Sequence, residues 1–573
     1  MEVQLIVCDR SFHHSHIEAA GEHRIMTGSR IFHTEKTLLL AWFLISLIIG
    51  VLTVHEYGMS VDEPNNYRYS ADTLAAYPSL FGILYEPKHD SSYEGHGPAF
   101  VAMAGLVIRI IQSVFPDVYT PDLWHFSYYI TFLFAGLCIH WLAKRWFNRW
   151  TAWGILLLFS TQPLLLGHAF INPKDIPFLF FFTLSIGLGF RLVDSMQGVE
   201  PSASLTGMTE ELTRKFHQAD ARRKRRFLIW LVPALLVFMA LAVFSRQVNV
   251  LVEQTVAYFF TAGPESWAGR IFSAVASQAS NLTAQDYSAK AIKLLHRVEW
   301  IAVCAGLLFF LAYFGLLISN TTLSASVQKA WRQRHQLRKV AASAAQSGKG
   351  SLTLASLRNW LRETFRAFRS SRLVLAGIAL GLATAIRAIA PLAGVIVILY
   401  LFLKTRSRGS ATAIAYFLVA GMTTYLAWPY LWAAPVQRYF QELVGASNFQ
   451  NFSGQVLFGG QFYGIRDLPR LYLPILLSIQ FTEPVILGLL IGFSVLVWRL
   501  LRSRVRADLL LYLGMGFAFP LLMLILLNSP LYHNFRQALF LAPPLFILAA
   551  FALDLFFHTL TRNWARLLLI VLI

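Results

Sequence analysis

The sequence predicts an all-α protein that crosses the membrane about thirteen times, and its composition, its apolar runs and its charge placement all support this fold class. Hydrophobic residues make up 56% of the 573 residues, whereas charged residues account for only 14%. A typical soluble protein carries about 25% charged residues, so most of this surface cannot face water. The composition therefore indicates a polytopic membrane protein and argues against a set of soluble domains.

Apolar runs of 15 to 23 residues recur along the chain, close to the roughly 20 residues that a helix needs to cross the hydrocarbon core. The first run follows a polar tail and is too long for the core of a signal peptide, so we expect it to remain as an anchor. The predicted spans are 37–54, 125–143, 151–168, 176–194, 227–245, 300–320, 373–387, 389–403, 411–428, 485–500, 508–527, 537–557 and 563 onward.

The segment 97–114 is apolar enough to cross as well. The residues alone leave two topologies open. Either this segment lies at the membrane interface and the N-terminus is inside, or the segment spans and the N-terminus is outside.

Clusters of Lys and Arg set the orientation of the predicted bundle, because such residues collect in cytoplasmic loops. The clusters all fall on one side, and with that side inside the cell 35 of the 49 Lys and Arg residues are cytoplasmic. This placement accounts for the net charge of +19, so we expect membrane lipids and no nucleic acid as partners. The clusters lie at 144–150, 222–227, 321–372, 404–408 and 502–506.

The expected organisation is a cytoplasmic tail, 1–36, followed by one transmembrane domain, 37–573. The larger cytoplasmic loops are basic and lack the Gly-rich signature of a phosphate cradle, so we interpret them as solvated connectors. A nucleotide-driven transporter would need a domain that none of these loops can hold. The cytoplasmic loops are 195–226 and 321–372, and the outward loops are 55–124, 246–299 and 429–484.

The first outward loop is dense in charged and polar side chains, unlike solubilising filler. Paired carboxylates at a membrane surface can act as a general base or bind a metal, because the low dielectric strengthens their interactions. Asp62 before Glu63 and Pro64 also fits a helix N-cap, and the two interpretations are compatible. The candidates in this loop are Asp62, Glu63, Tyr67, Arg68 and His96.

The turn GHAFINPKDIPF between two spans holds His168, Lys174 and Asp175, more polar groups than a short turn usually needs. As alternatives, Asp175 could cap the following helix and His168 could be a satisfied interfacial histidine.

Arg387 falls where an outward hairpin must turn, since both flanks are basic. A charge costs about 2.5 to 3.5 kcal/mol at the membrane centre, so Arg387 should be paired or bind an anion. The alternative is that its side chain snorkels to the interface. Tyr532 and Arg536 begin a later span on the outward side, where an aromatic belt with an Arg anchor is an equal alternative.

Several of these segments resemble one family. SVDEPNNYRYS, GHGP, NPKDIPF, GLATAIRAIAPLAG and YHNFRQALFLAPP are similar to segments of the bacterial protein O-mannosyltransferase-like glycosyltransferases. These belong to the C-type membrane superfamily, which also contains the aminoarabinose transferase of lipid A. The resemblance runs from about residue 50 to 550 and is strongest at the Asp-Glu pair and NPKDIPF. It implies about thirteen spans, an external Asp-Glu loop and a juxtamembrane helix after it.

The resemblance also implies an activity. Such enzymes transfer a sugar, with inversion, from a polyprenyl-phosphate carrier to an acceptor hydroxyl on a protein, lipid or glycan. The site would face the outside of a bacterial plasma membrane. No cofactor would be obligatory, although Asp62, Glu63 and Asp175 could hold a divalent cation such as Mg²⁺ or Mn²⁺.

The resemblance assigns roles residue by residue. Asp62 would be the base, Glu63 would orient the acceptor or the helix start, and Asp175 would contact sugar hydroxyls or Arg387. Arg387 and His96 would bind the carrier phosphate. His96 stands where the lipid A enzyme has a Lys, and a neutral imidazole is a weaker partner for an anion. The other substrate-binding candidates are Tyr67, Arg68, His168, Lys174, Tyr532 and Arg536.

Two other classes compete with a transferase. A secondary transporter or flippase of a lipid-linked or anionic substrate also has many spans and buried charges. Transporters usually place these charges at the midplane between inverted repeats, whereas here the polar groups cluster at one face and no such repeat is evident. A structural scaffold or sensor would leave the outward charges unexplained.

Overall fold

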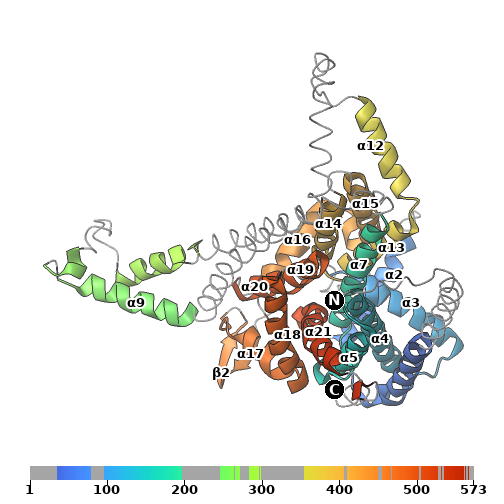
Figure 1. The fold of residues 1–573 in the computed structure, drawn as a ribbon, viewed down its shortest axis with the longest axis horizontal. Coiled ribbons are helices and arrows are strands. Elements are labelled where there is room, and N and C mark those ends of the chain that lie inside the picture. Colours follow the sequence, from blue (N-terminus) through green and yellow to red (C-terminus); the bar gives the residue numbers. More distant parts are fainter. Residues whose placement is uncertain are drawn as a thin grey trace, which may run out of the picture.

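The protein is described here from a computed structural model, in which a bundle of long helices carries shorter helices at its ends (Figure 1). Statements about structure below refer to the residues that it describes. These are 35–78, 96–196, 245–263, 265–270, 283–295, 297–298, 354–405, 409–448, 454–465, 467–502, 505–526, 531, 534–560, 562 and 565–566.

The described chain is almost entirely helical, as the sequence predicts. After a first helix at Glu35–Glu56, the helices of the bundle are α4 (Thr120–Trp146), α5 (Arg149–Ser160), α6 (Pro163–Ile171), α7 (Asp175–Ser195), α13 (Ser371–Thr384), α14 (Pro391–Thr405), α15 (Ser410–Ala427), α18 (Glu483–Leu501), α19 (Ala507–Leu513), α20 (Phe519–Leu526) and α21 (Ala542–Thr559). The remaining helices are α2 (Glu63–Ala76), α3 (Ala99–Val114), α9 (Ser245–Thr261), α12 (Leu354–Ala367), α16 (Pro435–Asn448) and α17 (Tyr472–Gln480). The short helical turns are η1 (Val54–Glu56), η4 (Pro429–Trp432), η5 (Gly514–Ala518) and η6 (Arg536–Leu541).

Seven helices in the described residues are long and apolar enough to cross a membrane, or up to nine if each of two bent pairs is one span. The chain is therefore an integral membrane protein of the polytopic class. The predicted runs 227–245 and 300–320, and the run from 563 onward, lie almost wholly outside the described residues. The number thirteen stays a prediction.

Helix α7 is the centre of the bundle, and it packs against α4, α13 and α14. Its apolar side chains are buried, including Phe178, Phe182 and Phe190. Two glycines allow close approach, since a Cβ at Gly187 would collide with Trp141 of α4 and one at Gly189 would collide with Val397 of α14. Small residues at such positions are typical of tightly packed membrane helices.

The predicted span 151–168 is broken into α5 and α6, which are bent by 59°. Pro163 begins α6, and a proline cannot donate the backbone hydrogen bond that would continue the preceding helix. The side chain of Gln162 fixes the bend, because its Oε1 accepts from the Thr482 backbone N at 3.3 Å and its Nε2 donates to the Gln480 carbonyl at 3.1 Å.

The ambiguous segment 97–114 forms α3, a helix of 16 residues. Its length of about 24 Å is shorter than the ~30 Å hydrocarbon core. Helix α3 packs against α2 and α4. The length favours the interfacial alternative, which is also the one that the resemblance implies.

Two details differ from the sequence expectation. The loop 321–372, expected to be a solvated connector, contains α12, whose Trp360 Nε1 donates to Ser410 Oγ at 3.3 Å. The outward loop 429–484 contains an antiparallel hairpin of β1 (Gln455–Phe458) and β2 (Gln461–Gly464). Gly459 and Gly460 make its turn at φ values of 58° and 78°, which favours a tight two-residue hairpin turn.

Candidate active site

The predicted site residues come from four distant segments and meet at one end of the bundle, the end at which α7 begins. We call it the site end. Asp62 precedes α2, Lys174 and Asp175 begin α7, Arg387 follows α13, and Arg536 begins η6. The charges of Asp62, Asp175, Arg387 and Arg536 all act on Lys174. The five side chains therefore form one cluster.

Asp62 stands at the N-cap position of α2, but its side chain makes no capping hydrogen bond. Its Oδ2 instead accepts a hydrogen bond from Arg536 Nη2 at 3.2 Å. The side chain remains 43% exposed. The sequence therefore placed Asp62 correctly at the start of the helix, but its carboxylate does not cap α2 and is partly exposed.

Glu63 has a different environment from its neighbour, because its side chain is completely buried. The Nε2 atom of His125 lies 3.0 Å from Oε1 and 3.1 Å from Oε2 of Glu63, and the Tyr67 hydroxyl donates to Oε2 at 3.1 Å. Tyr67 in turn stacks on Trp124, with 4.8 Å between ring centroids. Burial and the adjacent carboxylate raise the pKa of Tyr67, so it stays a proton donor. Glu63 was expected to orient either the acceptor or the start of the helix. This geometry favours the second role, in which Glu63 holds the start of α2 against α4.

Asp175 is held by two side chains, because it forms an ion pair with Arg387 and accepts a hydrogen bond from Asn172 Nδ2 at 3.0 Å. Lys174 occupies the N-cap position of α7, and the side chain of Asn172 holds this start of the helix. The Asn172 Oδ1 accepts from the backbone N of Asp175 at 2.8 Å and of Lys174 at 3.2 Å. The alternative in which Asp175 is the cap is therefore wrong, and its carboxylate is available to position Arg387.

Arg387 lies in the turn between α13 and α14 and is partly buried, with 29% of its side chain exposed. Its Nε atom is buried and has no hydrogen-bond partner among the described residues. An unsatisfied buried donor costs about 1 to 3 kcal/mol unless a ligand or water fills it. The snorkelling alternative does not fit this geometry, whereas an anion at Nε would complete it.

His96 reaches the cluster because the chain after it lies against the end of α13. The backbone N of Ala99 donates to the Ala385 carbonyl at 3.0 Å, and a Cβ at Gly97 would collide with that carbonyl. The Nδ1 atom of His96 lies 2.8 Å from Glu442 Oε1 of α16. Burial lowers the pKa of His96, and the positive charges of Lys174 and Arg387 lower it as well. The carboxylate of Glu442 opposes this shift by raising the pKa. A neutral imidazole is thus the expected form near pH 7.

Lys174 is the most perturbed cation of the site. Burial, together with the charges of Arg387 and Arg536, lowers its pKa to about 7, and Asp62 and Asp175 oppose this shift. Its charge is therefore sensitive to whatever binds beside it.

Other predicted residues are placed less centrally. His168 lies beside the cluster, with its Nδ1 3.5 Å from Asn172 Nδ2. Arg68 is exposed on α2 and makes no hydrogen bond or ion pair with any residue that the structure describes. Tyr532 lies outside the described residues.

Two contributors were missed by the sequence analysis. Glu442 lies in α16, inside the predicted outward loop 429–484. This part of the sequence has no recognisable motif, and only the pattern of apolar and polar residues around Glu442 could have pointed to it. His125 begins a predicted span, where a histidine is easily read as an interfacial residue.

The cluster combines three cations with one accessible carboxylate, Asp62, and one buried carboxylate, Asp175. Lys174, Arg387 and Arg536 face Asp62 and Asp175, so the cluster can accept further negative charge. Within the described ranges no group of three or more His, Cys, Asp or Glu side chains is arranged to hold a metal ion. Glu63 contacts His125 and Tyr67, and a divalent cation at Asp62, Glu63 and Asp175 stays a prediction.

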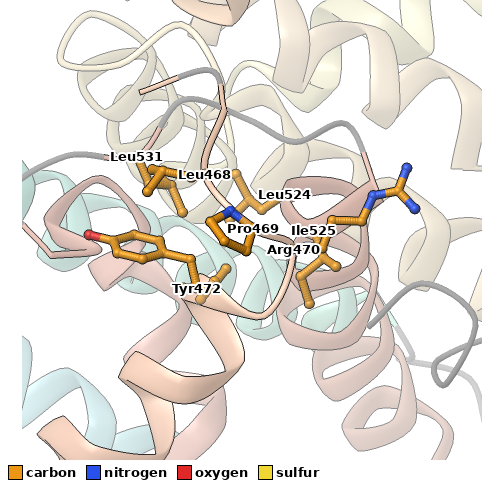
Figure 2. Close-up of a pocket in the computed structure, with 8 residues that line it drawn as sticks. Leu468, Pro469, Arg470, Tyr472, Leu524, Ile525 and Leu531 are labelled. Carbon is orange, nitrogen blue, oxygen red and sulfur yellow. The ribbon is translucent and has the colours of Figure 1, made fainter. Parts of the chain in front are cut away.

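A pocket beside the site is too small for a substrate. It lies between the start of α17 and the end of α20 (Figure 2) and its volume is about 10 Å³, roughly that of one water molecule. One wall has a structural role. The Tyr472 hydroxyl donates to the Asn534 carbonyl at 3.2 Å, which fixes the segment that presents Arg536.

Residues 351–530 of the chain match the family model of glycosyltransferase family 87. No curated protein and no solved structure matches the chain. The matched stretch is less than half of the chain and includes Arg387 and Glu442 but not Asp62, Lys174 or Asp175. The match indicates a membrane glycosyltransferase, which uses a sugar donor and an acceptor. It gives no specific support to a mannosyltransferase or to a lipid A transferase.

Proposed function

We propose that the protein transfers a sugar from a polyprenyl-phosphate-linked donor to an acceptor hydroxyl, with inversion, using Asp62 as the base. The match to glycosyltransferase family 87 supports the reaction class. The observation that carries the proposal is the contact of the accessible Asp62 carboxylate with Arg536, inside a cluster that also holds Lys174 and Arg387.

A single displacement needs two things from the protein, and the cluster can supply both. The acceptor oxygen attacks the anomeric carbon while the bond from that carbon to the phosphate oxygen breaks. The phosphate leaves with the electron pair, and Lys174, Arg387 and Arg536 stabilise its charge. The hydroxyl proton passes to Asp62, which contributes as a general base.

Arg536 connects the two halves of this chemistry. Without a donor, Arg536 Nη2 donates to Asp62 Oδ2 and so occupies one oxygen of this carboxylate. A donor phosphate competes with Asp62 for Arg536. Donor binding would therefore release the base only when the leaving group is in place.

The proposed location follows from charge placement. The basic clusters favour a cytoplasmic position for the opposite end of the bundle, so the site end would face outward from a bacterial plasma membrane. The acceptor could then be a protein, a lipid or a cell-envelope glycan. The polyprenyl chain would lie among the lipids beside the bundle.

The test is sugar transfer by purified protein in liposomes, with a radiolabelled polyprenyl-phosphate sugar and membrane extract as acceptor. Asp62→Asn keeps the shape but removes the basicity, and we expect a loss of about 10²- to 10⁴-fold. The matched control is Asp117→Asn, at an exposed acid of the same predicted outward loop, which should retain transfer. Near-normal transfer by a folded Asp62→Asn protein would overturn the proposal. Carrier movement without sugar transfer in the wild type would indicate a flippase instead.

A further inference from the structure

A second pocket lies at the other end of α4 and α7, which we call the basic end. It has a volume of about 280 Å³ and is lined by Trp141, Leu142, Lys144, Arg145, Gly187, Arg191 and Asp194. Asp175 and Asp194 lie near opposite ends of the same helix, about 30 Å apart at 1.5 Å per residue. This distance matches the hydrocarbon thickness, so the pocket sits at the opposite membrane boundary from the candidate active site.

One wall of the pocket is a satisfied network around Arg145. Arg145 pairs with Asp194, its Nε donates to Asp508 Oδ2 at 2.6 Å, and its Nη2 donates to the Tyr400 hydroxyl at 3.0 Å. Its guanidinium also lies 5.1 Å from the centroid of the Phe190 ring. The guanidinium nitrogens of Arg145 therefore all donate to protein groups, and this residue is part of the scaffold.

Arg191 is different, because it makes no hydrogen bond or ion pair with any residue that the structure describes. Its side chain is exposed, and it lies one helical turn before Asp194 on α7. Lys144 is also exposed and donates to Glu35 Oε1 at 2.6 Å. Three cations and one carboxylate line the pocket, so a ligand with negative charge is favoured there.

The remaining lining residues are apolar and aromatic. Trp141 packs against Gly187, where any side chain would collide with the indole, and this close contact joins α4 to α7 below the charged rim. Leu142 is buried beside it. An indole at a membrane boundary suits an amphipathic ligand. Inorganic phosphate would use the cations but not this apolar floor.

We propose that this pocket binds the phosphodiester headgroup of an anionic phospholipid, with Arg191 and Lys144 as the phosphate partners. Basic pockets between membrane helices on the cytoplasmic side are a recurrent solution for such headgroups. The glycerol and upper acyl carbons lie against Trp141. The bound lipid ties α4 to α7 at the end remote from the candidate active site. The site is independent of the proposed transfer reaction.

The test is titration of the full-length protein in detergent with phosphatidylglycerol or phosphatidylcholine, followed by native mass spectrometry. We expect phosphatidylglycerol to bind and phosphatidylcholine not to bind. Arg191→Gln should weaken phosphatidylglycerol binding about fivefold, the effect of one basic residue near the surface. It should leave the melting temperature unchanged because Arg191 has no partner in the described structure. Arg372→Gln removes an exposed arginine at the start of α13, outside the pocket, and serves as the matched control.

Three outcomes would overturn the proposal. Equal affinity of the Arg191→Gln and Arg372→Gln variants would place the lipid elsewhere. Equal binding of phosphatidylglycerol and phosphatidylcholine would show that the negative charge of the headgroup is not recognised. Displacement of phosphatidylglycerol by millimolar inorganic phosphate would assign the pocket to free phosphate, whereas resistance to displacement supports the lipid.

Discussion

Two charge networks lie at opposite ends of α7, and they differ in how completely their groups are satisfied. At the basic end Arg145 and Arg506 both donate to Asp508, while Asp194 and Tyr400 complete the network. At the site end the Nε atom of Arg387 has no partner among the described residues, and Asp62 is 43% exposed with Arg536 beside it. A closed network stabilises a fold, whereas an open one is ready for a ligand.

The comparison gives opposite expectations for substitutions at the two ends. In the Arg145 network at the basic end, truncation should lower stability and affect transfer only through the amount of folded protein. At the site end, substitution should affect binding and transfer more than stability. The following predictions test this contrast in order of decreasing expected effect.

Arg145→Ala should be the most destabilising change, because it leaves Asp194 without its arginine and removes one of the two arginines that pair with Asp508. Breaking a buried ion network typically costs about 3 to 5 kcal/mol. The loss should appear as a lower free energy of unfolding in a mild denaturant titration. Arg149→Ala, an exposed arginine nearby, provides the control. A melting temperature equal to that of the control would show that the network is not structural.

Glu63→Gln should cost less, because glutamine fills the same space and can still accept from Tyr67. We expect a loss of stability of about 1 to 3 kcal/mol, since the charged partner of a buried hydrogen-bond network is replaced by a neutral group. Transfer per folded molecule should fall far less than in Asp62→Asn. A loss of transfer as large as that of Asp62→Asn, with normal stability, would show that Glu63 takes part directly in catalysis.

Lys174 should give the site a pH dependence of modest size. Burial lowers its pKa to about 7, so it is charged below that pH and neutral above it. Affinity for the phosphodiester donor should therefore decrease as pH rises through about 7, because the donor keeps one negative charge throughout. Lys174→Arg stays charged and should flatten the profile. An identical decrease in both proteins would exclude Lys174 as the titrating group.

The sequence predicted the spanning helices and the members of the site better than it predicted their roles. The length of an apolar run and the basic residues that flank it are local properties of the sequence. Helices such as α7 and α18 therefore coincide with predicted spans. Arg387 was identified because a charge is expensive near a membrane, whereas Asp62, Asp175 and Arg536 were identified from polar groups gathered beside predicted spans and from the family resemblance.

Roles depend on contacts between distant segments, which no local pattern encodes. Asp62 and Asp175 were both candidates for helix caps. Asp62 does stand at the N-cap position of α2, but its carboxylate pairs with Arg536, and the side chain that holds the start of α7 is that of Asn172. Glu63 and Asp62 are adjacent in sequence, yet one is sealed against His125 and the other is open. The partners His125 and Glu442 could be recognised only once the helices were packed. The hairpin β1–β2 was missed because its strands are four residues each, too short for a clear alternation.

The central claim, that the open network at the site end binds the carrier phosphate, is tested most directly by the affinity for a polyprenyl phosphate. Arg387→Ala should weaken binding by about one to two orders of magnitude, because a charge-assisted contact contributes about 1.5 to 3 kcal/mol. Arg387→Lys separates charge from a bidentate geometry, since lysine keeps only the former. Arg109→Ala, an exposed arginine of α3, is the control.

Removing Arg387 alone leaves Asp175 buried without its partner, so the same titration should include the double variant Arg387→Ala, Asp175→Asn. Arg387→Ala and the double variant should both bind the carrier weakly. The double variant should keep a melting temperature near that of the wild type. Wild-type affinity in the folded double variant would contradict this prediction, and Arg387 would then serve only to anchor the turn between α13 and α14.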